Sequence, residues 1–401
     1  MLILADENMP FAREAFSTLG EVRLAPGRKI TAEAVRDCEI LAVRSVTRVD
    51  ERLLAGSRVR FVGTATIGTD HIDTAWLVRA GIGFASAPGS NAVSVAEYIV
   101  AALFVLAERL DFRINEKSLG IIGVGNVGRR VAARAEALGL KVVLNDPPLA
   151  AKTGDHRYRS LEEILACDIV TLHVPLEKGG PYPTFHLVDE KFIERLKPGA
   201  ILLNTSRGAV VRTAALEAGL GAGKPAAAVL DVWEGEPEIS LSLMERVAIA
   251  TPHIAGYSYD GKVRGTRMIY EAACAHFGRE PSWTEAGALP SPAKADLPLE
   301  GDLSRARELV GAVVRESYDI LADDRDLRKI GTLVPVERAG WFDSLRKNYP
   351  VRREWDSRTV ALGGGLESLE PLLKGLGFRV WIAGCEIDLP LGKRGIEEDL
   401  T

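Results

Sequence analysis

Nine residues at 120–128 constrain the possible fold more than any other stretch of this sequence. They read Gly-Ile-Ile-Gly-Val-Gly-Asn-Val-Gly, so that Gly-x-Gly-x-x-Gly follows an apolar run and precedes a helical segment, Arg129 to Leu138. In a strand–turn–helix unit, Gly123 would form the tight turn and Gly125 would let backbone N–H groups approach a pyrophosphate. Gly128 would allow the helix to pack closely on the strand. The motif therefore predicts a dinucleotide-binding fold.

An acidic residue follows this motif at the spacing that a dinucleotide-binding fold requires. The next apolar run ends in Asn145-Asp146, close to the roughly 20 residues after the glycines at which such an acid is expected. A carboxylate there can accept hydrogen bonds from both ribose hydroxyls of NAD, and it would repel the 2′-phosphate of NADP. We expect NAD as the cofactor. The alternatives are a glycine turn that binds nothing and a nucleotide fold that serves another adenine cofactor.

Short apolar runs alternate with helical segments along most of the chain, which predicts parallel sheets with crossover helices. A first unit has strands expected at 2–5, 22–24, 40–44 and 59–63. A second unit, suited to a doubly wound sheet, has six, expected at 119–124, 141–145, 168–174, 200–204, 226–232 and 247–250. Pro88-Gly89-Ser90-Asn91 separates the two units, before a long apolar helix expected at 92–109.

Helix signals extend this organisation. Asp70 is expected to cap a helix at about 72–80, and Gly81 to end it. A helix at about 262–277 has no further strand of the second unit to precede, so we expect it to return to the first unit. After a proline-rich linker, helical spacing at 306–314 and a strand–helix–strand pattern at 359–382 predict a small α+β unit.

The predicted architecture is therefore a Rossmann-type NAD domain inserted in a flavodoxin-like substrate domain, followed by a C-terminal α+β domain. We assign residues 1–91 and 257–285 to the substrate domain, 92–256 to the NAD-binding domain and 286–401 to the C-terminal domain. At this length, each domain is expected to have a buried core of its own.

Composition and charge exclude several classes of protein. The net charge is −5 and the lysine and arginine residues are scattered, so the sequence predicts no basic surface that would bind nucleic acid. The longest apolar stretch, 92–107, contains Glu97 and is shorter than the roughly 20 residues that a membrane span needs. No Cys-x-x-Cys pair indicates a metal site or a disulfide framework, and the four cysteines are expected to be buried thiols in a reducing compartment: Cys38, Cys167, Cys274 and Cys385. We expect a cytoplasmic protein without a membrane or nucleic-acid partner.

Three chemically matched residues follow three successive predicted strands of the second unit. They are Arg207 in Asn-Thr-Ser-Arg-Gly, Glu236 in Asp-Val-Trp-Glu-Gly-Glu-Pro, and His253 in Pro-His-Ile-Ala-Gly. The arginine can grip a carboxylate bidentately. A glutamate bonded to an imidazole fixes the tautomer of the ring, so the histidine can exchange a proton with a hydroxyl. These residues predict a dehydrogenase for small hydroxy acids. The alternative interpretation is that the arginine lies in a surface loop and the histidine is structural.

These three motifs and the glycine-rich motif at 120–128 resemble the signatures of the D-isomer-specific 2-hydroxyacid dehydrogenase family, and the resemblance covers about residues 40–270. The resemblance implies that NAD is the cofactor, that Arg207 and Glu236 are catalytic and that His253 transfers the proton. It also implies further residues of the NAD site, with Asp146 and Arg207: Gly123, Gly125, Asn126, Val127, Gly128, Val174, Thr205, Ser206, Asp231 and Gly256.

A narrower resemblance, to the 4-phosphoerythronate dehydrogenase family of vitamin B6 biosynthesis, covers nearly the whole chain. It rests on Ala5-Asp6-Glu7-Asn8-Met9-Pro10, on Val43-Arg44-Ser45-Val46-Thr47, on 63–71 and on Ile254-Ala255-Gly256-Tyr257. Residues 342–349 and 352–355 are similar to that family's C-terminal dimerisation domain. The resemblance implies a phosphorylated hydroxy-acid substrate, a homodimer, and Ser45, Thr66 and Tyr257 as substrate contacts.

Two alternatives remain open at this point. One is another D-2-hydroxyacid dehydrogenase, such as one acting on 3-phosphoglycerate, and the other is an NAD-sensing protein that has lost its chemistry. Arg44 alone offers too few hydrogen-bond donors for the substrate phosphate, so we hypothesise that Arg346 completes the phosphate site. The alternative is that Arg346 lies on a solvated face or in a dimer contact.

Overall fold

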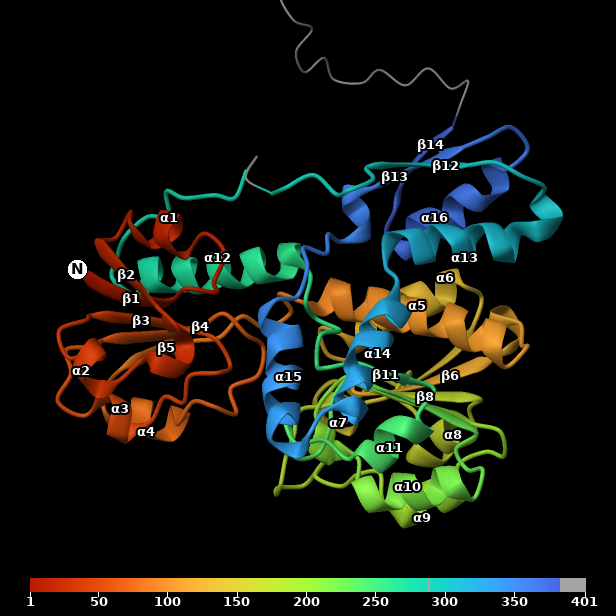
Figure 1. Ribbon diagram of the computed structural model, residues 1–401, viewed down its shortest axis with the longest axis horizontal. Coiled ribbons are helices and arrows are strands. Elements are labelled where there is room, and N and C mark those ends of the chain that lie inside the picture. Colours follow the sequence, from red (N-terminus) through yellow and green to blue (C-terminus); the bar gives the residue numbers. More distant parts are fainter. Residues whose placement is uncertain (287–288, 383–401) are drawn as a thin grey trace, which may run out of the picture.

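The computed structural model describes residues 1–286 and 289–382 (Figure 1). Its first sheet is parallel and has the strand order β2-β1-β3-β4-β5, which confirms the expected flavodoxin-like arrangement. The strands are β1 (Leu2–Asp6), β2 (Glu21–Ala25), β3 (Ile40–Val43), β4 (Phe61–Thr64) and β5 (Gly83–Ala85). Four of them match the predicted runs. The fifth, β5, was not predicted, because it is only three residues long and begins with a glycine.

The helices of this unit are short, and one of them corrects the sequence prediction. They are α1 (Ala12–Phe16), α2 (Ala32–Val35), α3 (Glu51–Leu54) and α4 (Thr74–Arg79). The cap of α4 is Asp73, whose side chain accepts from the N–H of Trp76, so the expected cap at Asp70 was wrong. Asp70 instead contacts Arg207 in the second unit. Gly81 lies at φ +68°, as expected for the residue that ends the helix.

The second sheet is also parallel, with the order β7-β6-β8-β9-β10-β11. Its strands confirm all six predicted runs: β6 (Ser118–Ile122), β7 (Lys141–Asn145), β8 (Ile169–Leu172), β9 (Ile201–Asn204), β10 (Ala227–Leu230) and β11 (Ile249–Ala250). Its helices are α6 (Gly128–Ala137), α7 (Pro147–Thr153), α8 (Leu161–Leu165), α9 (Glu190–Arg195), α10 (Thr213–Gly221) and α11 (Leu241–Arg246). An isolated bridge joins Tyr158 to Leu144 of β7, in the position of a further edge strand of the Rossmann order.

Two long helices connect the units. The first, α5 (Ala92–Arg109), has the bounds that the sequence predicted, and α12 (Tyr259–His276) begins three residues earlier than expected. The side chains of Ile269, Tyr270 and Ala273 in α12 are buried in the core of the first unit. This packing supports the proposed assignment of α12 to the substrate domain.

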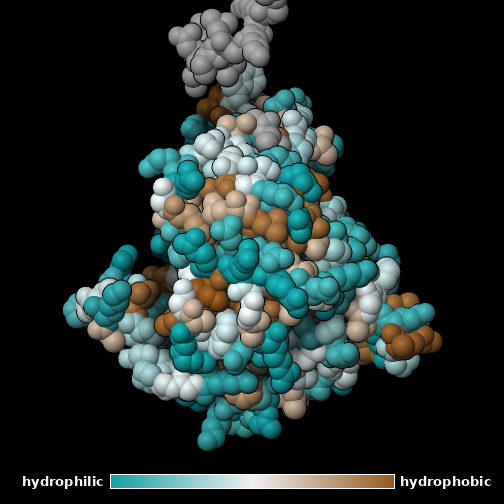
Figure 2. Space-filling view, turned by 90° about the vertical axis from the view of Figure 1, so that its left-hand side faces the viewer, coloured by the Kyte–Doolittle hydropathy of each residue, from teal (hydrophilic) through white to brown (hydrophobic). Residues whose placement is uncertain are grey.

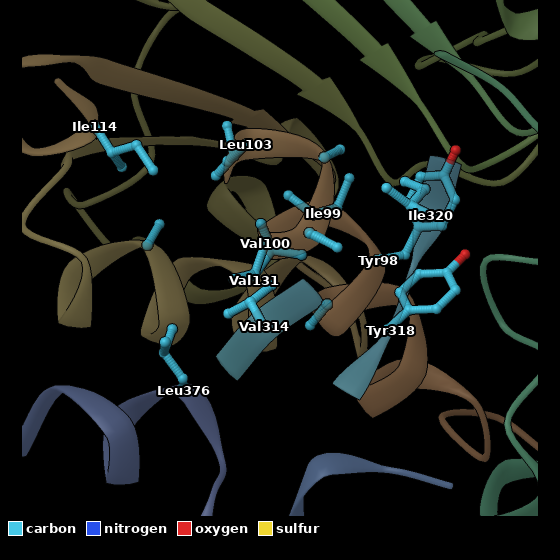
Figure 3. Close-up of a cluster of buried hydrophobic side chains, with 14 of the residues drawn as sticks. Tyr98, Ile99, Val100, Leu103, Ile114, Val131, Val314, Tyr318, Ile320 and Leu376 are labelled. Carbon is cyan, nitrogen blue, oxygen red and sulfur yellow. The ribbon is translucent and has the colours of Figure 1, made fainter. Parts of the chain in front are cut away.

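The C-terminal unit packs on the NAD-binding unit and shares its core. It contains the parallel strands β12 (Asp296–Leu299), β13 (Thr359–Leu362) and β14 (Arg379–Ile382), with α13 (Ala306–Ser317), α14 (Ile320–Arg328), α15 (Pro335–Lys347) and α16 (Glu370–Leu376). Figure 3 shows Leu103 of α5 and Val131 of α6 in one cluster with Val314 and Leu376. The expectation of a separate core was therefore wrong, because the apolar α5 has more than one face to bury.

Helix α15 lies between the first unit and the NAD-binding unit (Figure 1). Phe342 of α15 is fully buried in the core that contains α9, α10 and α11. One residue further along, Asp343 pairs with Arg28 of the first unit at 2.6 Å. The C-terminal unit therefore contacts both of the other units.

The side of the molecule that faces the viewer in Figure 2 is largely hydrophilic, with separate small apolar areas. No helix in the described residues is long and apolar enough to span a membrane. Cys38, Cys167 and Cys274 are buried free thiols, and burial raises the pKa of each, so they are poorly reactive. Cys385 lies outside the described residues.

Candidate active site

The glycine-rich loop between β6 and α6 has the geometry that its sequence predicts. Gly123 has φ +89°, and a Cβ there would lie 2.6 Å from the carbonyl oxygen of His173. A Cβ on Gly128 would overlap the carbonyl of Gly123, so only glycine lets α6 start this close to the strand. Open space lies beside Gly125. The loop can therefore admit a pyrophosphate at the N-terminus of α6.

Asp146 ends β7 and closes this loop from the other side. One carboxylate oxygen accepts from the N–H of Val124 at 2.8 Å, and the other accepts from the N–H of Leu149 at 2.9 Å, which caps α7. Asp146 thus holds the glycine-rich loop at the place where a ribose would follow the pyrophosphate. Its carboxylate is half-buried and lies at the position that the sequence assigned to it.

The remaining expected cofactor contacts surround the carboxyl ends of the central strands. Asn126 and Val127 lie in the glycine-rich loop, and Val174 follows β8. Thr205 and Ser206 follow β9, where Ser206 is buried and donates to Asn204 at 2.8 Å. Ligands bind at this edge of open α/β sheets, so the residues present fit a dinucleotide.

Arg207 points from the NAD-binding unit toward the first unit. Its Nε donates to Asp70 at 3.0 Å, and its Nη1 donates to the carbonyl oxygen of Ser206 at 2.8 Å. A Cβ on Gly68 would overlap Nη2, so the backbone of the loop after β4 lies directly against this guanidinium. The arginine is partly exposed, and in the described residues Nη2 is the guanidinium nitrogen that makes no hydrogen bond.

Glu236 and His253 form the hydrogen-bonded pair that their positions predicted. Oε2 of Glu236 lies 2.8 Å from Nδ1 of His253, and Oε1 accepts from the N–H of Trp233 at 2.7 Å. Burial raises the pKa of Glu236, but His253, this N–H group and Arg346 outweigh burial and lower the pKa below its usual value. The carboxylate therefore stays charged and can stabilise a protonated imidazole.

Asp231 holds the backbone on which His253 is presented. This buried carboxylate accepts from the hydroxyl of Thr251 at 2.6 Å and from the N–H groups of Ile254 and Ala255 at 2.8 and 2.9 Å. His253 has φ +58°, a conformation that non-glycine residues seldom adopt. A Cβ on Gly256 would overlap Asn91, so this turn is fixed on both sides.

A second histidine–glutamate pair lies nearby and was not predicted. His186 Nε2 lies 2.6 Å from Glu234, which also accepts from the N–H of Thr213 at the start of α10. This pair fixes a loop and a helix start. His71 and His173 contact threonine hydroxyls at 3.0 Å, and burial lowers their pKa to about 4 and about 3, respectively.

The expected substrate contacts come from the first unit and the C-terminal unit. Ser45 is exposed in the turn after β3, and the hydroxyl of Thr66 donates to the carbonyl of Gly68 at 3.0 Å. Arg44 and Arg346 both lie against the ring of Tyr257, at 5.7 and 5.9 Å from its centroid. The structure thus brings Arg346 into the same region as Arg44 within one chain.

Two further cations in this region were not found from the sequence. Lys262 Nζ lies 4.7 Å from the centroid of Tyr257. Buried Arg352 donates to the carbonyl oxygen of Ala255 at 2.6 Å. The only available signal for Lys262 was its place in the first turn and a half of α12, which does not specify what the side chain faces.

Comparison with known proteins identifies two regions of the chain. Residues 105–255 match the NAD binding domain of the D-isomer specific 2-hydroxyacid dehydrogenases. Residues 288–377 match a domain of unknown function, DUF3410. Among solved structures, D-lactate dehydrogenase of Aquifex aeolicus, complexed with NAD and lactic acid, is 28% identical, with a TM-score of 0.57 over 69% of this chain and 95% of that chain. An NAD-bound 3-phosphoglycerate dehydrogenase of Entamoeba histolytica shares the fold at 24% identity, with a TM-score of 0.60 over 69% of this chain and 95% of that chain.

Curated relatives extend the match to nearly the whole chain. The erythronate-4-phosphate dehydrogenases of Salmonella paratyphi B and Salmonella typhi are each 50% identical over 379 residues, which is 94% of this chain and 98% of theirs. Similarity of this extent includes the C-terminal unit as well as the NAD-binding domain. The chain therefore belongs to the erythronate-4-phosphate dehydrogenase family, with the NAD-binding domain of the D-isomer specific 2-hydroxyacid dehydrogenases.

Proposed function

We propose that this chain oxidises 4-phospho-D-erythronate to (R)-3-hydroxy-2-oxo-4-phosphooxybutanoate, in the cytoplasm and as a step of vitamin B6 biosynthesis. The observation that carries the proposal is the 2.8 Å contact between Glu236 and His253. This pair lies at the carboxyl edge of the sheet whose first strand, β6, is followed by the glycine-rich loop. The relatives of the same length, named for this substrate, support the substrate class.

Each of the three residues has one task in this reaction. Because Nδ1 of His253 faces Glu236, Nε2 is left to take the proton of the C2 hydroxyl. Arg207 would grip the substrate carboxylate and polarise the carbon that becomes the carbonyl. The glycine-rich loop and Asp146 would hold NAD, which would supply the acceptor for the hydride. In the reverse direction His253 returns the proton.

The substrate-binding residues in this proposal are Ser45, Thr66 and Tyr257, together with Arg44 and Arg346. This assignment is supported by the positions of the two arginines, which come from the first and third units and lie against the ring of the same tyrosine. That tyrosine follows His253 by four residues, and its N–H donates to the carbonyl of Ile254 in the same turn. The proton acceptor and the substrate contacts therefore share one short loop.

A homodimer formed through the C-terminal unit completes the proposal. Exposed valines support it, because Val336 is 88% exposed and Val334 is 55% exposed at the start of α15. Apolar side chains on that unit are candidates for burial between subunits. Light scattering coupled to size exclusion tests this assignment directly.

The function is tested by NADH formation with purified protein and three substrates: 4-phosphoerythronate, 3-phosphoglycerate and D-lactate. Preference for 4-phosphoerythronate is the expected result. Preference for 3-phosphoglycerate would assign the other dehydrogenase activity, and no turnover of any of them, with NAD still binding, would identify an NAD-sensing protein. The presence of Arg207, Glu236 and His253 in the expected places argues against that last role.

A further inference from the structure

The ring of Tyr257 is surrounded by positive charge from three parts of the chain. Lys262 of α12 lies 4.7 Å from the ring centroid, Arg44 from the loop after β3 lies at 5.7 Å, and Arg346 of α15 lies at 5.9 Å. We propose that Lys262, with Arg44 and Arg346, forms the binding site for the substrate phosphate. This inference rests on the proposed function and adds Lys262 to it.

The charges in this cluster are not balanced by carboxylates. Within residues 1–286 and 289–382, no carboxylate oxygen lies within 4.0 Å of a charged nitrogen of Lys262, Arg44 or Arg346. Glu236 and Asp343 face Arg346, but they are already paired with His253 and Arg28. Three cations gathered in this way are unfavourable unless an anion joins them.

Unused donors in the cluster support an anionic ligand. Nε of Arg346 is buried and has no hydrogen-bond partner among the described residues. Nε and Nη1 of Arg352 also have no hydrogen-bond partner among the described residues, and its guanidinium lies 4.2 Å from the centroid of the Tyr318 ring. Burial and the charges of Arg44 and Arg352 lower the pKa of Lys262 to about 7, which a bound anion would reverse.

The position of the cluster distinguishes the phosphate from the carboxylate of the substrate. Arg207 lies after β9 and pairs with Asp70, whereas the cluster surrounds the turn that follows His253. In 4-phosphoerythronate, the carboxylate and the phosphate lie on opposite sides of the reacting C2 carbon. A dianionic phosphate also matches several separate cations better than a monovalent carboxylate does.

The proposal is tested with Lys262→Met, which removes the charge and keeps the length of the side chain. The matched control is Lys141→Met, because Lys141 is exposed at the start of β7, at the opposite edge of the sheet. We expect Lys262→Met to raise the KM for 4-phosphoerythronate by about 10- to 100-fold, since one charged hydrogen bond is lost. Turnover of unphosphorylated erythronate should not change, and Lys262→Arg should restore much of the affinity.

Competition by inorganic phosphate separates this proposal from the proposed function. Phosphate should compete with substrate in the wild type and in Lys141→Met, and much less in Lys262→Met. If the wild type does not oxidise 4-phosphoerythronate but calorimetry shows phosphate binding that Lys262→Met weakens, the substrate is wrong and the site stands. Equal losses of kcat/KM with phosphorylated and unphosphorylated substrates would overturn the site.

A measurement on the wild type decides the matter if Lys262→Met does not fold. Burial and the neighbouring arginines lower the pKa of Lys262 to about 7, and an anion bound beside the lysine should raise this pKa. Phosphate binding should therefore take up protons, which is measured by calorimetry in buffers of different ionisation enthalpy. A wild type that binds no phosphate would overturn the site.

Discussion

Oε2 of Glu236 lies 2.8 Å from Nδ1 of His253, while its other oxygen accepts from the backbone N–H of Trp233. The carboxylate is thus fixed at both oxygens, and the histidine tautomer is fixed with it. If His253 is the proton acceptor, His253→Asn should lower kcat by about a hundredfold or more while leaving NAD affinity unchanged. Steady-state kinetics and fluorescence titration with NADH measure the two effects. Wild-type turnover in the variant would remove His253 from the mechanism.

Glu236→Gln should change the pH dependence of the reverse reaction. The glutamine keeps a contact with His253 but carries no negative charge to stabilise the protonated ring. The decline of keto-acid reduction with rising pH should therefore begin at lower pH than in the wild type. Rates measured across pH 5 to 9 show this, and an unmoved profile would disprove the electrostatic role.

Asp146→Asn should relax the preference for NAD over NADP. The asparagine oxygen can still accept from the N–H of Leu149 and cap α7, but the amide nitrogen cannot accept from the N–H of Val124, so the charge and one bond to the glycine-rich loop are lost together. We expect a higher KM for NAD and a smaller penalty for NADP, because the 2′-phosphate no longer meets a carboxylate. A cofactor preference identical to that of the wild type would mean that other residues recognise the ribose.

The strands and the candidate catalytic residues were predictable for one physical reason. A strand buried on both faces is a continuous apolar run, and the residue after it lies at the ligand-binding edge of the sheet. Arg207, Glu236 and His253 follow such runs. The cap at Asp73 was missed because Asp70 and Asp73 are equally good candidates by residue type, and only the tertiary contact of Asp70 with Arg207 separates them.

The residues near Tyr257 that come from α12 and α15 could not be predicted in this way, because their positions depend on packing between units. The position of Arg346 near Tyr257 depends on Phe342, which buries α15 against the NAD-binding unit. The sequence around Lys262 is an ordinary helix start with a cap at Ser258. Nothing local to these residues indicates that their side chains meet.

Gly68→Ala should impair catalysis without unfolding the protein. A Cβ at this position would overlap Nη2 of Arg207, and the end of a flexible side chain can move away at little cost in stability. We expect kcat/KM to fall at least about tenfold, with a Tm close to that of the wild type. Gly179→Ala is the matched control, since open space surrounds a Cβ there. Full activity in Gly68→Ala would show that the position of Arg207 is not critical.

The buried carboxyl of Glu97 should make the stability of the fold dependent on pH. This fully buried carboxyl of α5 accepts from the N–H of Trp355 at 2.8 Å, and burial together with Glu354 raises its pKa to about 8. Because the folded pKa exceeds the unfolded value, the stabilising contribution is complete below about pH 4.5 and is lost as pH rises through about 8.

Glu97→Gln should remove this dependence, because an amide oxygen can still accept from Trp355 and cannot ionise. Between pH 6 and pH 9 the wild type should lose about 1 to 3 kcal/mol of unfolding free energy relative to Glu97→Gln. Urea denaturation at several pH values measures the difference. Glu108→Gln, on an exposed position of the same helix, is the control and should follow the wild type. Parallel curves for the wild type and Glu97→Gln would mean that Glu97 is ionised in the folded state throughout this range.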